Sequence, residues 1–138
     1  MNISVILSII NYAFVLLFGI IVSLYLSDIN FSDNKFIYIR TVLIFGLVQI
    51  IFYLIMGEST LYKCYPLLIH LPLVLLIHFK FHKSIIISII SVLSAYLLCT
   101  PRKWVGTFVA YFFNNNPDIS NLVSIIITIP LIIIVIKY

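Results

Sequence analysis

The chain has 138 residues, of which 64% are hydrophobic and only 9% are charged, and its formal net charge is +4. Soluble domains carry about 25% charged residues, and a domain of this size cannot hide so much apolar surface from water. The basic residues lie at the ends of apolar stretches rather than in a patch with aromatic residues, so no nucleic-acid partner is expected. Composition therefore predicts an all-α, polytopic bundle of transmembrane helices in the lipid bilayer, a multi-pass protein of the cell (plasma) membrane.

Uncharged stretches divide the chain into five or six segments, most of them near the roughly 20 residues that a membrane-spanning helix needs. The expected spans are about 3–26, 36–56, 64–79, 84–98 and 119–136, with 104–113 as a doubtful sixth. The polar turn at 100–103 is expected to end the fourth span, and 104–113 is then a short span, a re-entrant piece or an interfacial helix. The first stretch lacks the basic start and the cleavage site of a signal peptide, so it is expected to be retained. Residues 1–138 are expected to form a single membrane-embedded domain.

With six spans both termini lie on the same side of the bilayer, and with five they do not. With six spans, the side of the N-terminus carries Lys63, Arg102, Lys103 and Lys137, and the opposite side carries Lys35, Arg40, Lys80 and Lys83. Four basic residues against four is a tie, so the positive-inside rule alone predicts no orientation.

Polar side chains inside the spans are the next signal. Ser4, Ser8 and Asn11 share one face of the first span, which indicates helix packing or, as the alternative, a polar permeation path. Gly19 and Ser23 form a small-xxx-small pair that lets another helix approach closely, and Gln49 is expected to hydrogen-bond to a neighbouring helix. A further stripe of small residues indicates that the fourth span packs closely, most simply against the third: Ser84, Ser88, Ser91 and Ala95.

The third span contains Pro66 and Pro72 on either side of His70. Each proline removes a backbone donor and frees a carbonyl one turn earlier, which lipid cannot satisfy. This helix is therefore expected to be kinked and mostly surrounded by other helices. His70 is either a neutral histidine that bonds a freed carbonyl or a ligand residue in a pocket.

Chemistry-bearing motifs are scarce. No Asp, Glu, Lys or Arg lies deep within a predicted span, which argues against a transporter with a buried carboxylate. His78 and His82 are too few for a metal site and lie beside lysines. No nucleophile, phosphate-loop or metalloprotease motif is present, so no enzyme activity, cofactor or metal is expected.

Several residues at the ends of the third and fourth spans that lie away from the turn at 80–83 are expected to share one depth in the membrane. Cys64 and Cys99 are equally far from the turn at 80–83, so they form either a disulfide or two free thiols. Aromatic residues at this depth are typical of an interfacial belt. The alternative is a pocket for a small anionic or amphipathic ligand, shaped by bends at Pro66 and Pro101, because an arginine there offers a forked donor. Its predicted lining is Tyr65, His70, Tyr96, Arg102 and Trp104.

Three fragments between Phe45 and Trp104 resemble a known family: FGLVQIIFYLIMGES, LYKCYPLLIHLPLVLLIHFKF and SAYLLCTPRKW. They are similar to the N-terminal membrane-sensor region of Firmicute sensor histidine kinases of the GHKL type. The resemblance implies an extracytoplasmic N-terminus, a homodimer, and a cytoplasmic kinase part that would follow beyond Tyr138. It implies no kinase activity for these 138 residues themselves.

The leading functional hypothesis is a membrane-embedded sensor or ligand-binding module, the signal-input region of a sensor histidine kinase. The alternative is a small transporter, a flippase or an accessory membrane subunit, and an intramembrane enzyme is the third hypothesis.

Overall fold

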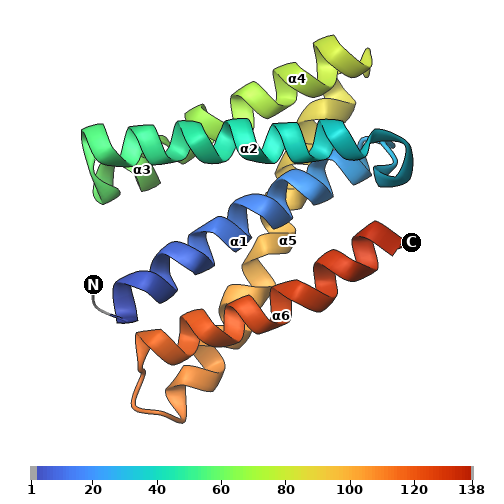
Figure 1. Ribbon diagram of the computed structural model, residues 1–138. Coiled ribbons are helices and arrows are strands. Elements are labelled where there is room, and N and C mark those ends of the chain that lie inside the picture. The colour runs from blue at the N-terminus through green and yellow to red at the C-terminus, as the bar shows by residue number, and fades with distance from the viewer. Residues whose placement is uncertain (1–2, 138) are drawn as a thin grey trace.

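The computed structural model describes residues 3–137, with the side chains of Glu58 and Tyr62 left out (Figure 1). It is all-α, as predicted. Its elements are α1 (Ile3–Leu26), α2 (Phe31–Met56), α3 (Glu58–Tyr65), the π-helical turn η1 (Pro66–His70), α4 (Leu71–Phe81), α5 (Ile85–Tyr111) and α6 (Pro117–Lys137). Five stretches of the described chain are long and apolar enough to cross a bilayer: α1, α2, residues Lys63–Phe81, α5 and α6. The protein is therefore a multi-pass membrane protein.

The central element is α1, which runs between α2 and α6 with α5 crossing behind it (Figure 1). No charged residue interrupts it, so its inner half can be enclosed by other helices. Ile20 and Leu24 are fully buried and belong to one apolar cluster with Phe45 of α2, Leu73 of α4 and Val92 of α5. This cluster holds the first four spans together.

The prediction that the proline-containing span is mostly surrounded by helices is wrong. One face of it is buried through Ile69, Leu73 and Ile77, but Leu67 and Phe79 on the outside are 64% and 68% exposed. Since the bilayer solvates such side chains as well as a protein interior does, the span can lie at the periphery.

The expected irregularity between the two prolines is present as the π-turn η1. Leu71 donates its N–H to the carbonyl of Pro66, one residue further back than in an α-helix. Pro72 has no N–H to offer the carbonyl of Leu68, so a regular α-helical ladder cannot continue through this segment. The third span is thus one helix with a widened turn near its outer end.

The predicted end of the fourth span at 100–103 is also wrong. Residues 84–98 and 104–113 belong mostly to the single 27-residue helix α5, which runs through Pro101 and ends at Tyr111. A proline inside a membrane helix is tolerated where neighbours compensate, and here Arg102, Gly106 and Ala110 are buried. The number of spans is five, and Arg102 lies nine residues before the end of α5, roughly 14 Å along the axis at about 1.5 Å per residue.

The close helix approach expected at Gly19 occurs elsewhere. Nothing lies within 4 Å of a Cβ built on Gly19, whereas a Cβ on Gly106 would lie 2.6 Å from the backbone oxygen of Ser120 and 2.4 Å from the Ser124 hydroxyl. The backbones of α5 and α6 therefore touch at Gly106. Of the predicted stripe of small residues, Ser88, Ser91 and Ala95 are buried on α5, whereas Ser84 is the exposed N-cap of that helix. Ala95 belongs to a cluster with Phe18 and Val22 of α1, so the stripe does not pack against the third span alone.

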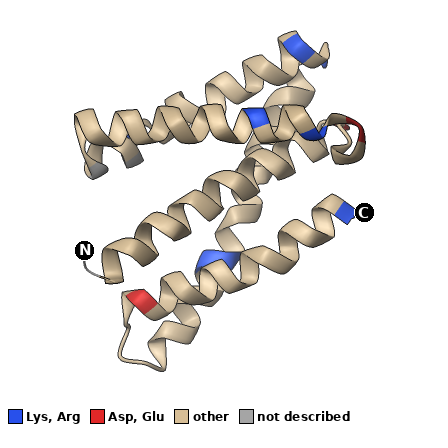
Figure 2. Cartoon of the chain, in the orientation of Figure 1, with Lys and Arg blue, Asp and Glu red and all other residues tan. Residues whose placement is uncertain are grey.

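Five spans place the chain ends on opposite sides of the bilayer and break the charge tie. Of the eight Lys and Arg residues, five lie on the side of the turn between α4 and α5, and three, including the buried Arg102, lie on the side of the N-terminus. Figure 2 shows blue segments gathered at the end of the bundle that holds this turn and the C-terminal end of α6. The five are Lys35, Arg40, Lys80, Lys83 and Lys137. The positive-inside rule then predicts that this end is cytoplasmic and that the N-terminus is outside.

We predict that Ser32→Cys and Lys83→Cys, in a Cys64→Ser, Cys99→Ser background, resist a membrane-impermeant maleimide added to intact cells. Asn115→Cys, in the opposite loop, should react. Permeabilised cells should label all three positions, and labelling of Lys83→Cys from outside would show the orientation to be inverted.

We also predict that Gly106→Ala lowers the thermal stability of the detergent-solubilised protein. The added methyl group meets the backbone of α6, and overpacking of this kind costs about 1–3 kcal/mol. Gly46→Ala is the matched control, because nothing lies within 4 Å of its Cβ position. Equal melting temperatures for the two variants would contradict the close contact.

Candidate functional site

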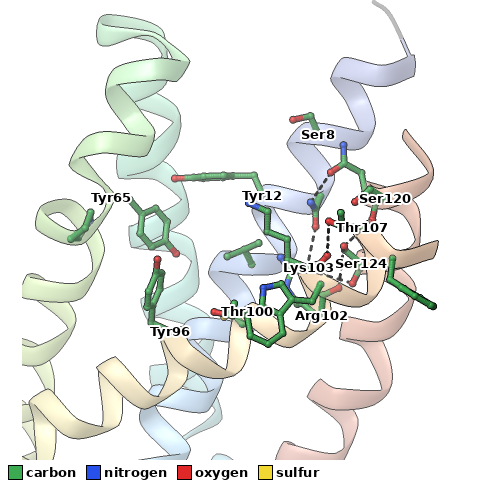
Figure 3. Close-up of a pocket in the computed structure, with 17 residues that line it drawn as sticks. Ser8, Tyr12, Tyr65, Tyr96, Thr100, Arg102, Lys103, Thr107, Ser120 and Ser124 are labelled. Carbon is green, nitrogen blue, oxygen red and sulfur yellow. Dashed lines mark hydrogen bonds between the residues drawn. The ribbon is translucent and has the colours of Figure 1, made fainter. Parts of the chain in front are cut away.

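A cavity of about 880 Å³ lies in the outer half of the bundle, between α1, α5 and α6, with the start of the third span as its fourth wall (Figure 3). Polar residues of α1 and α6 face it from two sides, among them Asn11, Asn121 and Ser124. The middle of α5 contributes Arg102 and Lys103. None of the seventeen lining residues is Asp or Glu, so the cavity is positively charged.

Arg102 is the central side chain of this site. It is 4% exposed, although it belongs to a membrane-spanning helix. Its Nη1 donates to the Thr128 hydroxyl at 2.8 Å, to the Asn11 side-chain oxygen at 3.2 Å and to the Ser124 carbonyl at 3.4 Å. One guanidinium nitrogen thus ties α5 to both α1 and α6.

The partners of Arg102 are themselves held in place. Asn11 donates from its amide nitrogen to the Asn121 side-chain oxygen at 2.9 Å, which joins α1 to α6 directly. The Thr128 hydroxyl donates to the Ser124 carbonyl at 2.6 Å, and the Ser124 hydroxyl donates to the Ser120 carbonyl at 2.8 Å. Their oxygens are therefore oriented before any ligand arrives.

The rest of the guanidinium has no partner among the described residues. Its Nε is buried and makes no hydrogen bond, and Nη2 donates to none of the described backbone or side-chain groups. Lys83 and Asp28 form an ion pair at 3.5 Å, but this pair lies at the other end of the bundle from Arg102. A buried charge without a counter-ion is costly. The Nε and Nη2 edge is the fork that binds a carboxylate or a phosphate with two parallel hydrogen bonds.

An aromatic cluster closes the side of the cavity next to the third span. Tyr65 and Tyr96 line the cavity and point toward one another in Figure 3. The His70 ring packs edge to face against both, with centroid distances of 5.2 Å to Tyr65 and 5.1 Å to Tyr96. Tyr12 of α1 packs in the same manner against Tyr65 at 5.9 Å.

The structure brings the five predicted site residues into one region. Tyr65, Tyr96, Arg102 and Trp104 line the cavity, and His70 lies behind the two tyrosines. Pro66, which was predicted to bend the backbone here, and Cys99 are also in the lining, whereas Pro101 is not. The third span and α5 supply much of the lining, as expected for a pocket between these two helices, but α1 and α6 also contribute to it. Burial of Arg102 likewise overturns the expectation that no basic residue lies deep within a span.

The remaining predicted residues lie elsewhere. Gln49 accepts a hydrogen bond at 2.5 Å from the Tyr12 hydroxyl, so it joins α2 to α1 as expected. Pro72 follows the π-turn, and Cys64 lies outside the cavity lining. Cys64 and Cys99 are both free thiols. His78 contacts the Lys83 carbonyl through Nδ1 at 2.8 Å, and the described residues contain no cluster suited to a metal ion.

Sequence reasoning missed the residues of the site that α6 supplies. Ser120, Ser124 and Thr128 follow one another at intervals of four residues, so they lie on one face of α6. That spacing is visible in the sequence and could have found them. Ser8 and Asn11 of the predicted polar stripe on α1 line the cavity, and Asn11 also joins α1 to α5 and α6, in keeping with the helix-packing interpretation.

No protein-family model, no curated protein and no solved structure matches this chain.

We predict that Thr128→Val destabilises the protein by about 1–2 kcal/mol. The substitution removes a hydrogen bond from a charged group within a buried network, and such bonds in membranes are worth about 0.6–2 kcal/mol. Thr107→Val is the control, because the exposed Thr107 hydroxyl bonds only to the Lys103 carbonyl of its own helix. Chemical denaturation in mixed micelles measures both, and equal stability of the two variants would show that the Arg102 network does not hold α5 to α6.

Proposed function

We propose that this protein is a ligand-binding sensor module of the plasma membrane, the signal-input region of a sensor histidine kinase, and that it binds an anion at Arg102. The observation that carries the proposal is the buried guanidinium with a free fork in a cavity that has no acidic residue. A carboxylate or phosphate group would supply the missing counter-charge and the two missing acceptors.

The third span connects the cavity to the cytoplasmic side. Tyr65 and Pro66 line the cavity, and the π-turn η1 begins at Pro66. π-Turns are weak points in a helix and often occur at functional sites. A ligand that displaces Tyr65 would alter this turn, and α4 would carry the change to the basic turn at 80–83. His70 contacts both Tyr65 of the third span and Tyr96 of α5, so it would couple a movement of one helix to the other.

The family resemblance supports the same assignment. Its most specific fragments, YPLLIHLPL and SAYLLCTPRKW, contain all five predicted site residues. They hold the π-turn, the aromatic cluster, Arg102 and Trp104, which the fold brings together. Proteins of that type would act as dimers, so we expect a homodimer.

A transporter or a flippase is the competing hypothesis, and the inner half of the bundle argues against it. The cavity contacts α1 from Ser8 to Val15, whereas from Leu16 inward α1 is enclosed by apolar side chains. A polar solute that entered the cavity would meet the buried Ile20 and Leu24. The outer cavity therefore favours binding over passage.

We predict that dodecyl phosphate, added to the protein in nanodiscs of neutral phosphatidylcholine, shifts the emission of Trp104. Trp104 is the single tryptophan of the chain and lines the cavity. Spin labels on Lys83→Cys and Lys137→Cys should change their separation at the same probe concentration. Arg102→Gln should weaken binding about tenfold or more, because loss of a paired charge costs several kcal/mol.

One control and two contrary outcomes decide between these hypotheses. Uncharged dodecanol should leave the Trp104 emission and the label separation unchanged. Saturable, Arg102-dependent uptake of labelled dodecyl phosphate into vesicles, without a change in label separation, would establish the transporter instead. Probe binding that is equal in the wild type and in Arg102→Gln would refute the anion site.

A further inference from the structure

A second hollow adjoins the cavity on the other side of α1. It has a volume of about 460 Å³ and lies between α1 and α2, where Val5, Ile9 and Ile50 give it an apolar surface. These three side chains are 46%, 50% and 62% exposed, so the hollow is a groove open toward lipid. Ser8 and Tyr12 line both the groove and the Arg102 cavity, and the two spaces therefore share a wall.

Tyr12 forms the partition between them. Its hydroxyl donates to Gln49 in the groove, and its ring packs edge to face against Tyr65 in the cavity. Gln49 is 4% exposed, and its amide nitrogen is buried without a hydrogen-bond partner among the described residues. A buried donor left without an acceptor costs about 1–3 kcal/mol, so the partition is not a fully satisfied packing contact.

We propose that the ligand is a single-chain anionic amphiphile, whose head group binds Arg102 and whose alkyl chain lies in the groove between α1 and α2. This inference rests on the proposed function, since it assigns the remainder of the ligand that fills the anion site. A charged head and an apolar chain match the charged cavity and the apolar groove on either side of Tyr12, whose side chain the ligand would displace. The groove is a single hollow of about 460 Å³ between two neighbouring helices, so we assign it one alkyl chain rather than the two of a phospholipid.

The position of the two spaces also suits an amphiphile. Both lie toward the N-terminal end of α1, which the charge distribution places outside. An amphiphile in the outer leaflet already has its chain in hydrocarbon, so the chain gains little by entering the groove. The head group gains the fork of Arg102, and the groove decides which molecules bring a head group to it in the correct orientation.

Photo-cross-linking tests where the chain lies. The probes are dodecanoate and dodecyl phosphate with a diazirine near the end of the chain, applied to the full chain in neutral phosphatidylcholine nanodiscs. We expect mass spectrometry to find adducts concentrated on Val5, Ile9, Ile50 and Tyr53. Arg102→Gln should remove this concentration and leave only the diffuse labelling that an uncharged diazirine alcohol gives. The two head groups show whether the site prefers a carboxylate or a phosphate.

Matched variants test the groove itself. Ile50→Phe fills the groove and should weaken probe binding, followed by Trp104 emission, about tenfold. Ile51→Phe is the control, because Ile51 is similarly exposed at 47% and lies outside the groove lining. Equal binding by these two variants would refute the groove.

The outcomes separate the two proposals. Arg102-dependent binding with scattered adducts would overturn the groove assignment and leave the anion site standing. Binding without any dependence on Arg102 would overturn both. Displacement of the probe by phosphatidylglycerol in the disc, with that lipid retained on the purified protein, would overturn the single-chain ligand and make a bilayer phospholipid the occupant.

Discussion

The cost of placing a guanidinium inside a bilayer governs this structure. An arginine near the centre of a membrane helix costs about 2.5–3.5 kcal/mol on insertion scales, so it needs neighbours that replace water. Arg102 obtains them from both sides, through Asn11 on α1 and Thr128 on α6. The helices that supply these oxygens are also those that pack most extensively against one another in the bundle. Three helices thus meet around one charge, and the cavity lies where they leave that charge incompletely satisfied.

Hydrophobic patterning predicted the all-α membrane fold and four of the five spans to within a few residues at most boundaries, because the bilayer allows few alternatives to a helix. It failed at residues 100–103, where Pro101, Arg102 and Lys103 have the composition of a turn. In water such a cluster would end a helix, but here Arg102 turns inward to polar oxygens of other helices. Those oxygens belong to residues 91 and 26 positions away along the chain, so the sequence around Arg102 does not show that they lie next to it.

The site was predictable in part, because position along a helix follows from the sequence but rotation about the helix axis does not. Tyr65, Tyr96, Arg102 and Trp104 line one cavity, and their location toward one end of the bundle follows from counting residues along antiparallel helices. Rotation about the helix axis does not follow from counting, so the partners of these residues on α1 and α6 could not be assigned. His70 shows the difference, because its contacts, two tyrosine rings rather than a freed carbonyl, depend on how the helices are turned about their axes.

The contact of α5 with α6 at Gly106 has a consequence for how the protein is made. While α6 is still being synthesised, α5 would present Arg102 to lipid without Thr128 or the Ser124 carbonyl to receive it. The short turn after Tyr111 and the close approach at Gly106 let the last two helices pair as soon as both have emerged. We therefore expect α5 to remain beside the insertion machinery until α6 joins it, so that the two enter the bilayer together as a helical hairpin.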